Sequence, residues 1–480
     1  MGEGNAQHSV GEIPEWVKPY ECPVNEISVK PSQINVQCIL FDYQENRDAK
    51  TSYHHMAVKA LSPSGVDNIS QLQIHFNPAY YQVVVHAIRV LRNGNWSDRL
   101  EDAKQSILQR ETGLDQNLYH GNLTLVYFLN DIQEGDVVEY AYSILGEDPL
   151  HASHYTNIFY FQEEESIEKM VYRLLASPSF SFRTKSMNVD IEPQITDISP
   201  FVREWIWESA ETPPYVYEPG QPIWHNPISQ IQISQFANWG EVAQKECLLY
   251  RLPSDFLETI PLDMQALVEE WMDKAQDSET RALLALRFVQ DKIRYLGIEE
   301  GAGAVEPRPP RLTFQRRFGD CKDKTVLLHA LLALMDIDST PLLVQSKGGG
   351  RLPEALPMPF LFDHVVLQLK INGKFYFVDP TINLQGGSLE NNYFPNYGWG
   401  LLLDRNTKEL TPLPEPSMVT PITIETSIIL TSEDRAYLKI ETVLRDSEAE
   451  MGRSWVERLG VKKSLRTVLR GCKQSMELFL

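Results

Sequence analysis

The chain lacks any long apolar run. No stretch reaches the roughly 20 consecutive apolar residues that a membrane-spanning helix needs, and the polar segment Met1 to Val10 lacks the apolar core of a signal peptide. We therefore expect no transmembrane segment. The compartment stays open, because this start suits a cytoplasmic protein and also a periplasmic or secreted protein whose leader has been removed.

Basic residues are fewer than acidic ones. The chain has 44 Lys and Arg against 65 Asp and Glu, and its net charge is −21. Because phosphate recognition relies on clustered Lys and Arg, this charge argues against a nucleic-acid partner. It favours solubility instead.

Cysteines are few, odd in number and scattered: Cys22, Cys38, Cys247, Cys321 and Cys472. They form neither a CxxC pair nor the spacing of a disulfide framework. The HExxH motif and the Walker lysine are absent as well. We therefore expect neither a metal ion nor a cofactor.

The pattern along the chain predicts an α+β protein of several domains. Short apolar runs alternate with turn signals over residues 24–200, which predicts an antiparallel β-sandwich. A Pro-rich, aromatic stretch predicts an ordered connector over 201–245. Helical patterns followed by strands predict the main domain over 246–412. We expect an incomplete β-rich unit over 413–480, whose basic end could be a packed helix or, less favoured, a membrane-surface or partner-binding helix.

A cysteine stands where a loop becomes a helix. Residues 325–335 are apolar almost all round, which is typical of a buried helix. Asp320 is a good N-cap, and Asp323 approximates a capping box. Gly319 permits a sharp turn, so Cys321 is predicted at about the first helical position. There the helix dipole favours a thiolate, and free backbone N–H groups, including that of Cys321, could receive an oxyanion.

A predicted hairpin offers a base and a carboxylate to orient it. Asn372-Gly373 is the dipeptide favoured in two-residue type I′ turns. Counting outward from this turn places Val366 opposite Asp379. His364 then lies diagonal to Asp379 on the same face, about 7–8 Å away at the backbone, within reach of an imidazole and a carboxylate.

Each of these residues also has a structural explanation. A lone Cys is usually a small buried hydrophobe, a lone His satisfies a local hydrogen bond, and an Asp before Pro starts a turn. The ordered set of Cys321, His364 and Asp379 nevertheless favours catalysis, because a thiol nucleophile needs a base and an orienting group. His329 and Asp363 are expected to be structural.

Five short motifs occur in order over about residues 260–385: Tyr295-Leu296-Gly297-Ile298, Pro307-Arg308-Pro309, Phe318-Gly319-Asp320-Cys321-Lys322-Asp323-Lys324, Asp363-His364-Val365 and Asp379-Pro380-Thr381. Together they resemble bacterial transglutaminase-like domains of the papain-like cysteine superfamily. The resemblance implies a papain-like core in which Cys321 is the nucleophile, His364 the general base and acid, and Asp379 its orienter. The preceding segment, with Glu134 to Tyr140 and Pro219 to Pro222, more loosely resembles the β-rich domain of unknown function that precedes such domains.

The same resemblance raises an oxyanion candidate. Papain-like enzymes often use a glutamine upstream of the cysteine, and Gln315 precedes Cys321 by six residues. Gln315 is followed by Arg316-Arg317, so a solvated loop residue fits this position equally well.

These observations predict cysteine-dependent acyl transfer on peptide or protein amides through a thioester. Hydrolysis, by a peptidase or amidase, is favoured over cross-linking by a transglutaminase. The alternative from another class is a non-catalytic module that binds protein or glycan. In either case the N-terminal β-sandwich could engage a protein or a cell-envelope partner.

Overall fold

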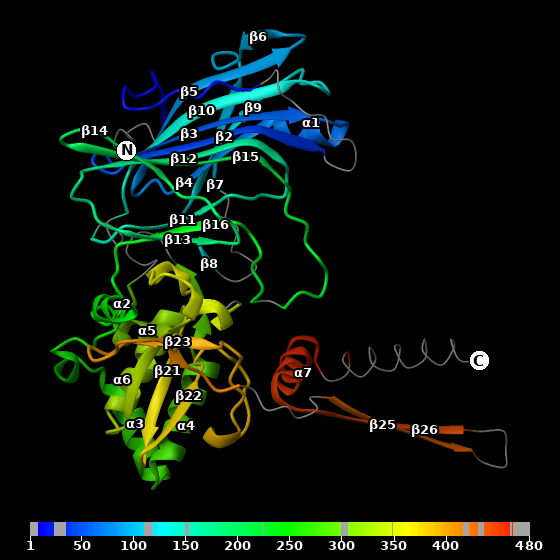
Figure 1. The fold of residues 1–480 in the computed structure, drawn as a ribbon. Coiled ribbons are helices and arrows are strands. Elements are labelled where there is room, and N and C mark those ends of the chain that lie inside the picture. The colour runs from blue at the N-terminus through cyan, green and yellow to red at the C-terminus, as the bar shows by residue number, and fades with distance from the viewer. Residues whose placement is uncertain are drawn as a thin grey trace, which may run out of the picture. The chain divides into compact units, whose positions relative to one another are not determined.

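The computed structural model describes residues 8–23, 35–109, 118–119, 121–148, 153–222, 224–298, 306–347, 349–415, 422–430, 436–460 and 463. The fold is mixed α and β and rich in strands (Figure 1). It divides into two compact units. Unit 1 consists of Met1–Val242, Ile298–Val305 and Arg351–Pro359, and unit 2 of Ala243–Gly297, Glu306–Gly350 and Phe360–Leu480.

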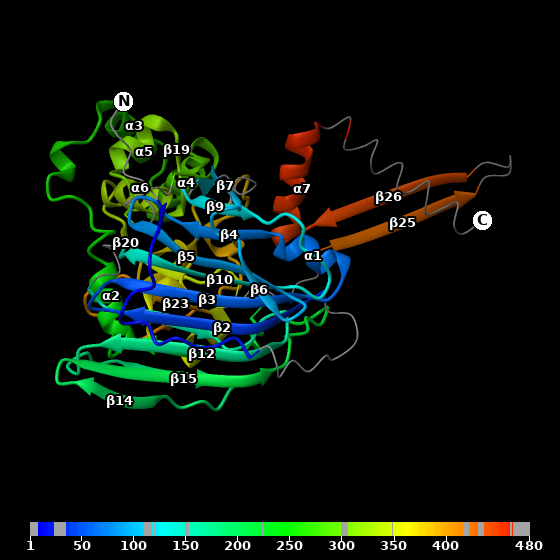
Figure 2. The same ribbon diagram turned by 90° about the horizontal axis from the view of Figure 1, so that it is seen from above.

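Unit 1 is built on a nine-stranded sheet, whose strands lie side by side in Figure 2. Their spatial order is β1 (His8–Val10), β5 (Tyr81–Arg92), β10 (Val137–Gly146), β3 (Thr51–Ala60), β2 (Val36–Asn46), β12 (Ile167–Ala176), β15 (Val202–Thr212) and β14 (Gln194–Ser199), with β6 (Asn95–Asp98) paired to β5. Most neighbours are antiparallel. The pairs β12 with β2 and β1 with β5 are parallel.

Two three-stranded sheets pack on this large sheet. The first contains β4 (Gln71–Phe76), β9 (Leu123–Phe128) and β7 (Lys104–Gln109), and the second β11 (Thr156–Tyr160), β16 (Gln230–Ser234) and β13 (Arg183–Met187). Every second residue of β4 is buried, as expected when one face of a strand packs on a core. Helix α1 (Pro63–Ile69) adds to the first layer. The core of unit 1 is therefore formed by sheets packed on a sheet.

The segment expected as a connector contributes to these sheets. Within residues 201–245, β15 pairs with β12 and β16 pairs with β11 and β13. Regular structure is absent between Pro213 and Pro222, so the Pro-rich character affects a shorter stretch. The division into four parts stays a prediction.

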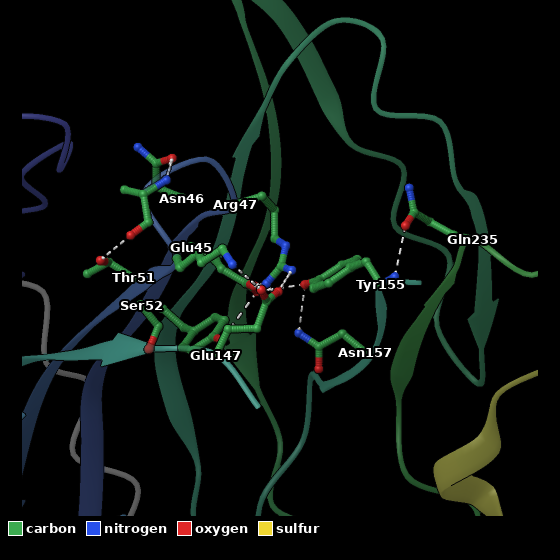
Figure 3. A network of polar contacts seen from close by, with 12 residues as sticks. Glu45, Asn46, Arg47, Thr51, Ser52, Glu147, Tyr155, Asn157 and Gln235 are labelled. Carbon is green, nitrogen blue, oxygen red and sulfur yellow. Dashed lines mark hydrogen bonds and ion pairs between the residues drawn. The ribbon is translucent and has the colours of Figure 1, made fainter. Parts of the chain in front are cut away.

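A polar network ties the end of β2 to the start of β11 (Figure 3). The buried carboxylate of Glu45 accepts a hydrogen bond from the Tyr155 hydroxyl at 2.6 Å and forms an ion pair with Arg47 at 2.9 Å. The guanidinium of Arg47 also pairs with Glu147 and lies over the Tyr155 ring, 4.5 Å from its centroid. Lys50 pairs with Glu147 from the exposed side at 2.8 Å. Arg47 is therefore the cation that compensates the buried charge of Glu45.

Unit 2 combines helices with a five-stranded sheet. The helices are α3 (Leu262–Lys274), α4 (Ser278–Lys292), α5 (Pro310–Arg316) and α6 (Cys321–Ala333). The sheet has the order β22 (Lys374–Val378), β21 (His364–Ile371), β20 (Asp338–Val344), β23 (Trp399–Leu402) and β24 (Thr411–Pro412). Helix α6 contacts α4, α5, β20 and β21, which explains why its sequence is apolar almost all round. Helices α3 and α4 lie in the stretch over 246–412 where the sequence predicts helices followed by strands.

The remaining elements are short or lie near the C-terminus. The short ones are β8 (Leu118–Tyr119), α2 (Trp239–Glu246), η2 (Phe256–Glu258), β17 (Arg294–Tyr295), β18 (Gly297–Ile298), β19 (Phe318–Gly319), η4 (Gly349–Glu354), η5 (Pro359–Leu361) and η6 (Leu389–Asn391). Near the C-terminus β25 (Ile422–Leu430) pairs with β26 (Ala436–Leu444), and α7 (Asp446–Leu459) follows. Beyond Gly460 only Lys463 is described, so most of the expected basic helix lies outside the described residues. Among the helices described, none is long and apolar enough to cross a membrane.

Replacing Arg47 by Met should destabilise unit 1 locally. The change leaves the buried carboxylate of Glu45 without its cation, and an uncompensated buried charge costs on the order of 3 kcal/mol. Amide hydrogen exchange of β2 and β3, measured on the full chain by mass spectrometry, should accelerate about a hundredfold. Lys50→Met is the matched control, because this exposed lysine contacts the same Glu147, and it should change exchange far less. Equal effects of the two substitutions would contradict the role given to Arg47.

Candidate active site

Cys321 is the first residue of α6, as its sequence predicts. Asp320 precedes it in extended conformation, and its Oδ1 accepts a hydrogen bond from the Asp323 backbone N–H at 3.0 Å. A Cβ added to Gly319 would lie 2.5 Å from the Cβ of Asp323, so close packing at the helix start requires glycine here. The side chain of Cys321 is therefore held at a capped N-terminus, where the backbone N–H groups of the first turn have no intrahelical acceptor.

The acidic side chains around this helix start are buried and form ion pairs with basic side chains. Lys322 Nζ lies 2.7 Å from Asp320 Oδ2. Arg308 contacts Asp323 through its backbone N–H at 2.7 Å and its guanidinium at 2.9 Å. The Pro-Arg-Pro motif and the motif around the cysteine are thus physically linked. The sequence suggests charged flanks, but Lys322 and Lys324 are only 7% and 0% exposed.

Lys324 lies beneath the site and caps the neighbouring helix. Its Nζ donates to the backbone oxygens of Ile293 at 2.7 Å and Gln290 at 3.3 Å, at the C-terminal end of α4. This is the end of a helix where a cation is favoured. Burial lowers the pKa of Lys324 to about 8, against the opposing charges of Asp379 and Asp291.

The predicted hairpin has the expected register. Ile371 pairs with Lys374, and the turn residues Asn372 and Gly373 have φ of 51° and 80°, as a type I′ turn requires. His364 begins β21, and its Nε2 lies 2.9 Å from Asp379 Oδ2. Both faces of the hairpin are covered, since Val366, on the face of His364, is completely buried.

The carboxylate of Asp379 is buried and fully engaged. Oδ1 accepts from the backbone N–H of Thr381 at 2.8 Å and from its hydroxyl at 2.6 Å. Oδ2 accepts from the Tyr397 hydroxyl at 2.7 Å in addition to His364. Burial alone would raise the pKa of Asp379, but the charge of His364 and these hydrogen bonds lower it to about 2. The group is therefore ionised across the physiological range.

The imidazole of His364 is held in its protonated form. Burial by itself would lower its pKa, but the charge of Asp379 and its hydrogen bond, with a further hydrogen bond to Cys321, raise the pKa well above the usual value. Because Nε2 faces Asp379, the other ring nitrogen, Nδ1, is available to the thiol. The structure thus brings Cys321, His364 and Asp379 together.

Several residues around this group carry no distinctive signal in the sequence. Tyr397 follows Asp379 by 18 positions. Tyr250 is buried near the thiol, and its pKa is raised well above the usual value by burial and then by Cys321. Thr381 is part of the Asp-Pro-Thr motif, where an Asp–Thr turn could have been foreseen. Gln315 has an exposed side chain on α5, and its role stays a prediction.

The two residues expected to be structural have local partners. His329 lies 2.8 Å from the Ser339 hydroxyl, and burial lowers its pKa to about 4. Asp363 accepts from the backbone N–H of Ser346 at 2.6 Å and from its hydroxyl at 2.7 Å. Asp363 therefore shapes the chain just before β21.

Known proteins resemble this chain in part of its sequence and most of its fold. Residues 46–216 match a family described as a Domain of Unknown Function with solved-structure structure (DUF3857). No curated protein matches. The crystal structure of a candidate protease from Parabacteroides distasonis ATCC 8503 has a TM-score of 0.63 at 10% identity, over 87% of this chain and 95% of that chain. That likeness shows a shared fold.

A second solved structure is much less similar. A candidate cysteine protease from Cytophaga hutchinsonii has a TM-score of 0.23 at 11% identity, over 61% of this chain and 90% of that chain.

Tyr397→Phe should destabilise the chain and make it more sensitive to acid. The substitution removes one donor to a buried carboxylate, which costs about 1.5–3 kcal/mol. The pKa of Asp379 then rises. A carboxylate with a depressed pKa contributes stability that is lost as pH falls through its folded-state value, so the acid-unfolding midpoint should move to higher pH. Circular dichroism during acid titration measures this midpoint.

Tyr376→Phe is the matched control. Its hydroxyl donates to Glu279 at 3.0 Å, away from Asp379, so the acid midpoint should stay near that of the wild type. An unchanged midpoint in Tyr397→Phe would contradict the role given to Tyr397.

Proposed function

We propose that the chain is a cysteine-dependent acyl-transfer enzyme that acts on peptide or protein amides and hydrolyses them. In this proposal unit 2 carries a transglutaminase-like core of the papain-like superfamily. Cys321 is the nucleophile, His364 the general base and acid, and Asp379 the residue that orients the ring. The observation that carries the proposal is the hydrogen bond between His364 and a buried, ionised Asp379, next to a cysteine at a helix N-terminus.

The charges around the three residues support this assignment. A thiolate is stabilised by an imidazolium and by a helix N-terminus, and both lie beside Cys321. Asp379 keeps the imidazolium paired, while Tyr397 and Thr381 fix the carboxylate. Apart from His364, Asp379 accepts hydrogen bonds from the backbone N–H and hydroxyl of Thr381 and from the hydroxyl of Tyr397. These groups act on the reaction only through Asp379, so we regard Tyr397 and Thr381 as positioning residues.

The reaction would proceed in two steps. With the thiol proton already on His364, the thiolate Sγ of Cys321 attacks the amide carbonyl carbon. The resulting oxyanion accepts hydrogen bonds from backbone N–H groups at the start of α6, including that of Cys321, and from Gln315 if its side chain turns inward. When the tetrahedral intermediate collapses, the C–N bond breaks and His364 returns the proton to the leaving amine. A thioester on Cys321 remains.

Water would complete the cycle. His364 takes a proton from a water molecule, whose oxygen attacks the thioester carbonyl carbon. The C–S bond breaks, a carboxylic acid leaves, and the thiolate remains beside the protonated His364, as at the start of the cycle. An amine in place of water would give cross-linking. The fold shared with a candidate protease agrees with hydrolysis.

Alkylation tests whether Cys321 is activated. At pH 6.5, iodoacetamide should modify Cys321 at least tenfold faster than Cys22 and Cys38, whose pKa values are raised by burial, that of Cys22 to about 12. His364→Gln should slow the labelling of Cys321 on the order of a hundredfold. Mass spectrometry of tryptic peptides over time gives the rate at each thiol.

Asp363→Asn is the control for that experiment. It removes a charge next to His364 in the sequence but from a carboxylate that binds Ser346, so Cys321 should keep its reactivity. Slow, uniform labelling of all thiols in the wild type would contradict the assignment of Cys321 as the nucleophile.

A peptide library tests the reaction itself. Incubation of the full chain with the library should give new carboxyl termini or deamidated side chains, and mass spectrometry distinguishes these from amine cross-links. Cys321→Ala should reduce all products to background, since no acyl intermediate can form. Cys247→Ala, which removes another free thiol, should leave the products unchanged. Background levels of product from wild type and Cys321→Ala alike would favour a chain that binds without catalysis, and equal products above background would contradict the role given to Cys321.

A further inference from the structure

Unit 1 contains a cavity of about 400 Å³ on the covered face of its nine-stranded sheet. Ligand sites in proteins commonly measure roughly 300–1,000 Å³, so the space suits a small molecule. The matched family and the proposed chemistry of unit 2 leave this cavity without a role. Its position and lining indicate what it could hold.

The cavity lies where two hydrophobic clusters meet. Ile69 and Leu72 of the first layer line one side, and they belong to the cluster beneath α1 and β4. Cys38 and Ile167 line the other side and belong to the cluster beneath β11 and β16. In the sheet register Cys38 pairs with both Val58 and Ile167, so the two clusters share one face of the large sheet. The cavity is thus the space that remains between two separate covering layers.

Apart from the carboxylates at one side, the cavity is lined by uncharged side chains, most of them apolar and a few of them amides. Phe41, Met56 and Val138 contribute to its walls. The hydroxyl of Tyr140 donates to the Met56 sulfur at 3.0 Å, and a thioether is a weak acceptor. Burial raises the pKa of the Cys38 thiol, so this side chain stays neutral. An apolar group that enters this part of the cavity would therefore not desolvate a charged side chain.

Carboxylates line one side of the same cavity. Glu163 is exposed and Glu165 half-buried, and both line the cavity, with Glu164 between them in the chain. No ion pair to any of the three occurs in the part of the chain that the structure describes. Although Glu163 keeps an exposed side, desolvation of the rest of the side chain, followed by repulsion from Glu165 and Glu164, raises its pKa. A cation bound here would relieve that repulsion.

We propose that this cavity binds an organic ammonium ion, with its apolar body among Phe41, Met56 and Val138 and its charged end at Glu163 and Glu165. The walls favour an apolar body, and the two carboxylates favour a positive over a negative end. The site lies wholly in unit 1 and does not depend on the function proposed for unit 2.

Calorimetric titration of the full chain with octylamine at pH 7 tests the proposal. Octanol and octanoate have the same apolar chain with a neutral and a negative end. Octylamine should bind about tenfold more tightly than octanol, because two partly exposed carboxylates each contribute modestly, and octanoate should bind most weakly. Equal binding of octylamine and octanol, or no binding of octylamine, would overturn the proposal.

Two variants locate the binding. Glu163→Gln together with Glu165→Gln should weaken octylamine about tenfold and leave octanol unchanged. The charge-matched control, Glu101→Gln with Glu134→Gln, removes two exposed acids that do not line the cavity and should bind like the wild type. Unchanged octylamine affinity in the first variant would place the cation elsewhere and refute the proposed site.

A third variant tests the cavity itself. Gln71→Trp adds a large ring at an exposed residue of β4 that lines the cavity, so it should block octylamine and octanol alike while the fold is retained. Retained binding of octylamine in this variant would rule out the cavity as the site. Far-ultraviolet circular dichroism confirms that each variant is folded.

Discussion

The carboxylate of Asp379 can remain ionised inside unit 2 only because four donors surround it. Isolated burial of such a charge costs several kcal/mol, and each donor recovers part of that free energy. The donors come from three places: His364 at the start of β21, Thr381 just after β22, and Tyr397 just before β23. The Asp379 backbone oxygen in turn accepts from Gln290 of α4 at 2.9 Å. Asp379 thus links these segments, since its carboxylate binds the strand ends and its backbone oxygen binds α4.

The same constraint governs the start of α6. An apolar helix begins there with two acids and two lysines, and the acids are paired: Asp320 with Lys322, and Asp323 with Arg308. Lys324 instead binds backbone oxygens at the end of α4. Charge compensation within a few ångströms lets a cysteine sit at a helix N-terminus without a solvated surface around it. Cys321 is only 7% exposed as a result.

Local features of the fold and site could be predicted from the sequence, and features that depend on distant partners could not. The cap at Asp320 and the turn at Asn372-Gly373 depend on residues within a few positions, so the helix start and the hairpin register followed directly. Tyr397 and Tyr250 approach the site from segments with no recognisable motif. The burial of Lys324 depends on α4, which local charge patterning cannot indicate. Residues 201–245 were expected as a connector because they are rich in proline. The two strands within them pair with distant partners, which the local composition does not indicate.

The parallel pairing of β2 with β12 has a consequence for how the chain assembles. Their partners are separated by about 129 positions, as the contact between Gln44 and Arg173 illustrates. During synthesis β2 can pair early with β3, but its other edge stays open until β12 has emerged. Loop closure over such a distance is slow, and an open strand edge invites pairing with other chains. The chain is therefore most prone to aggregate during synthesis, before β12 has emerged.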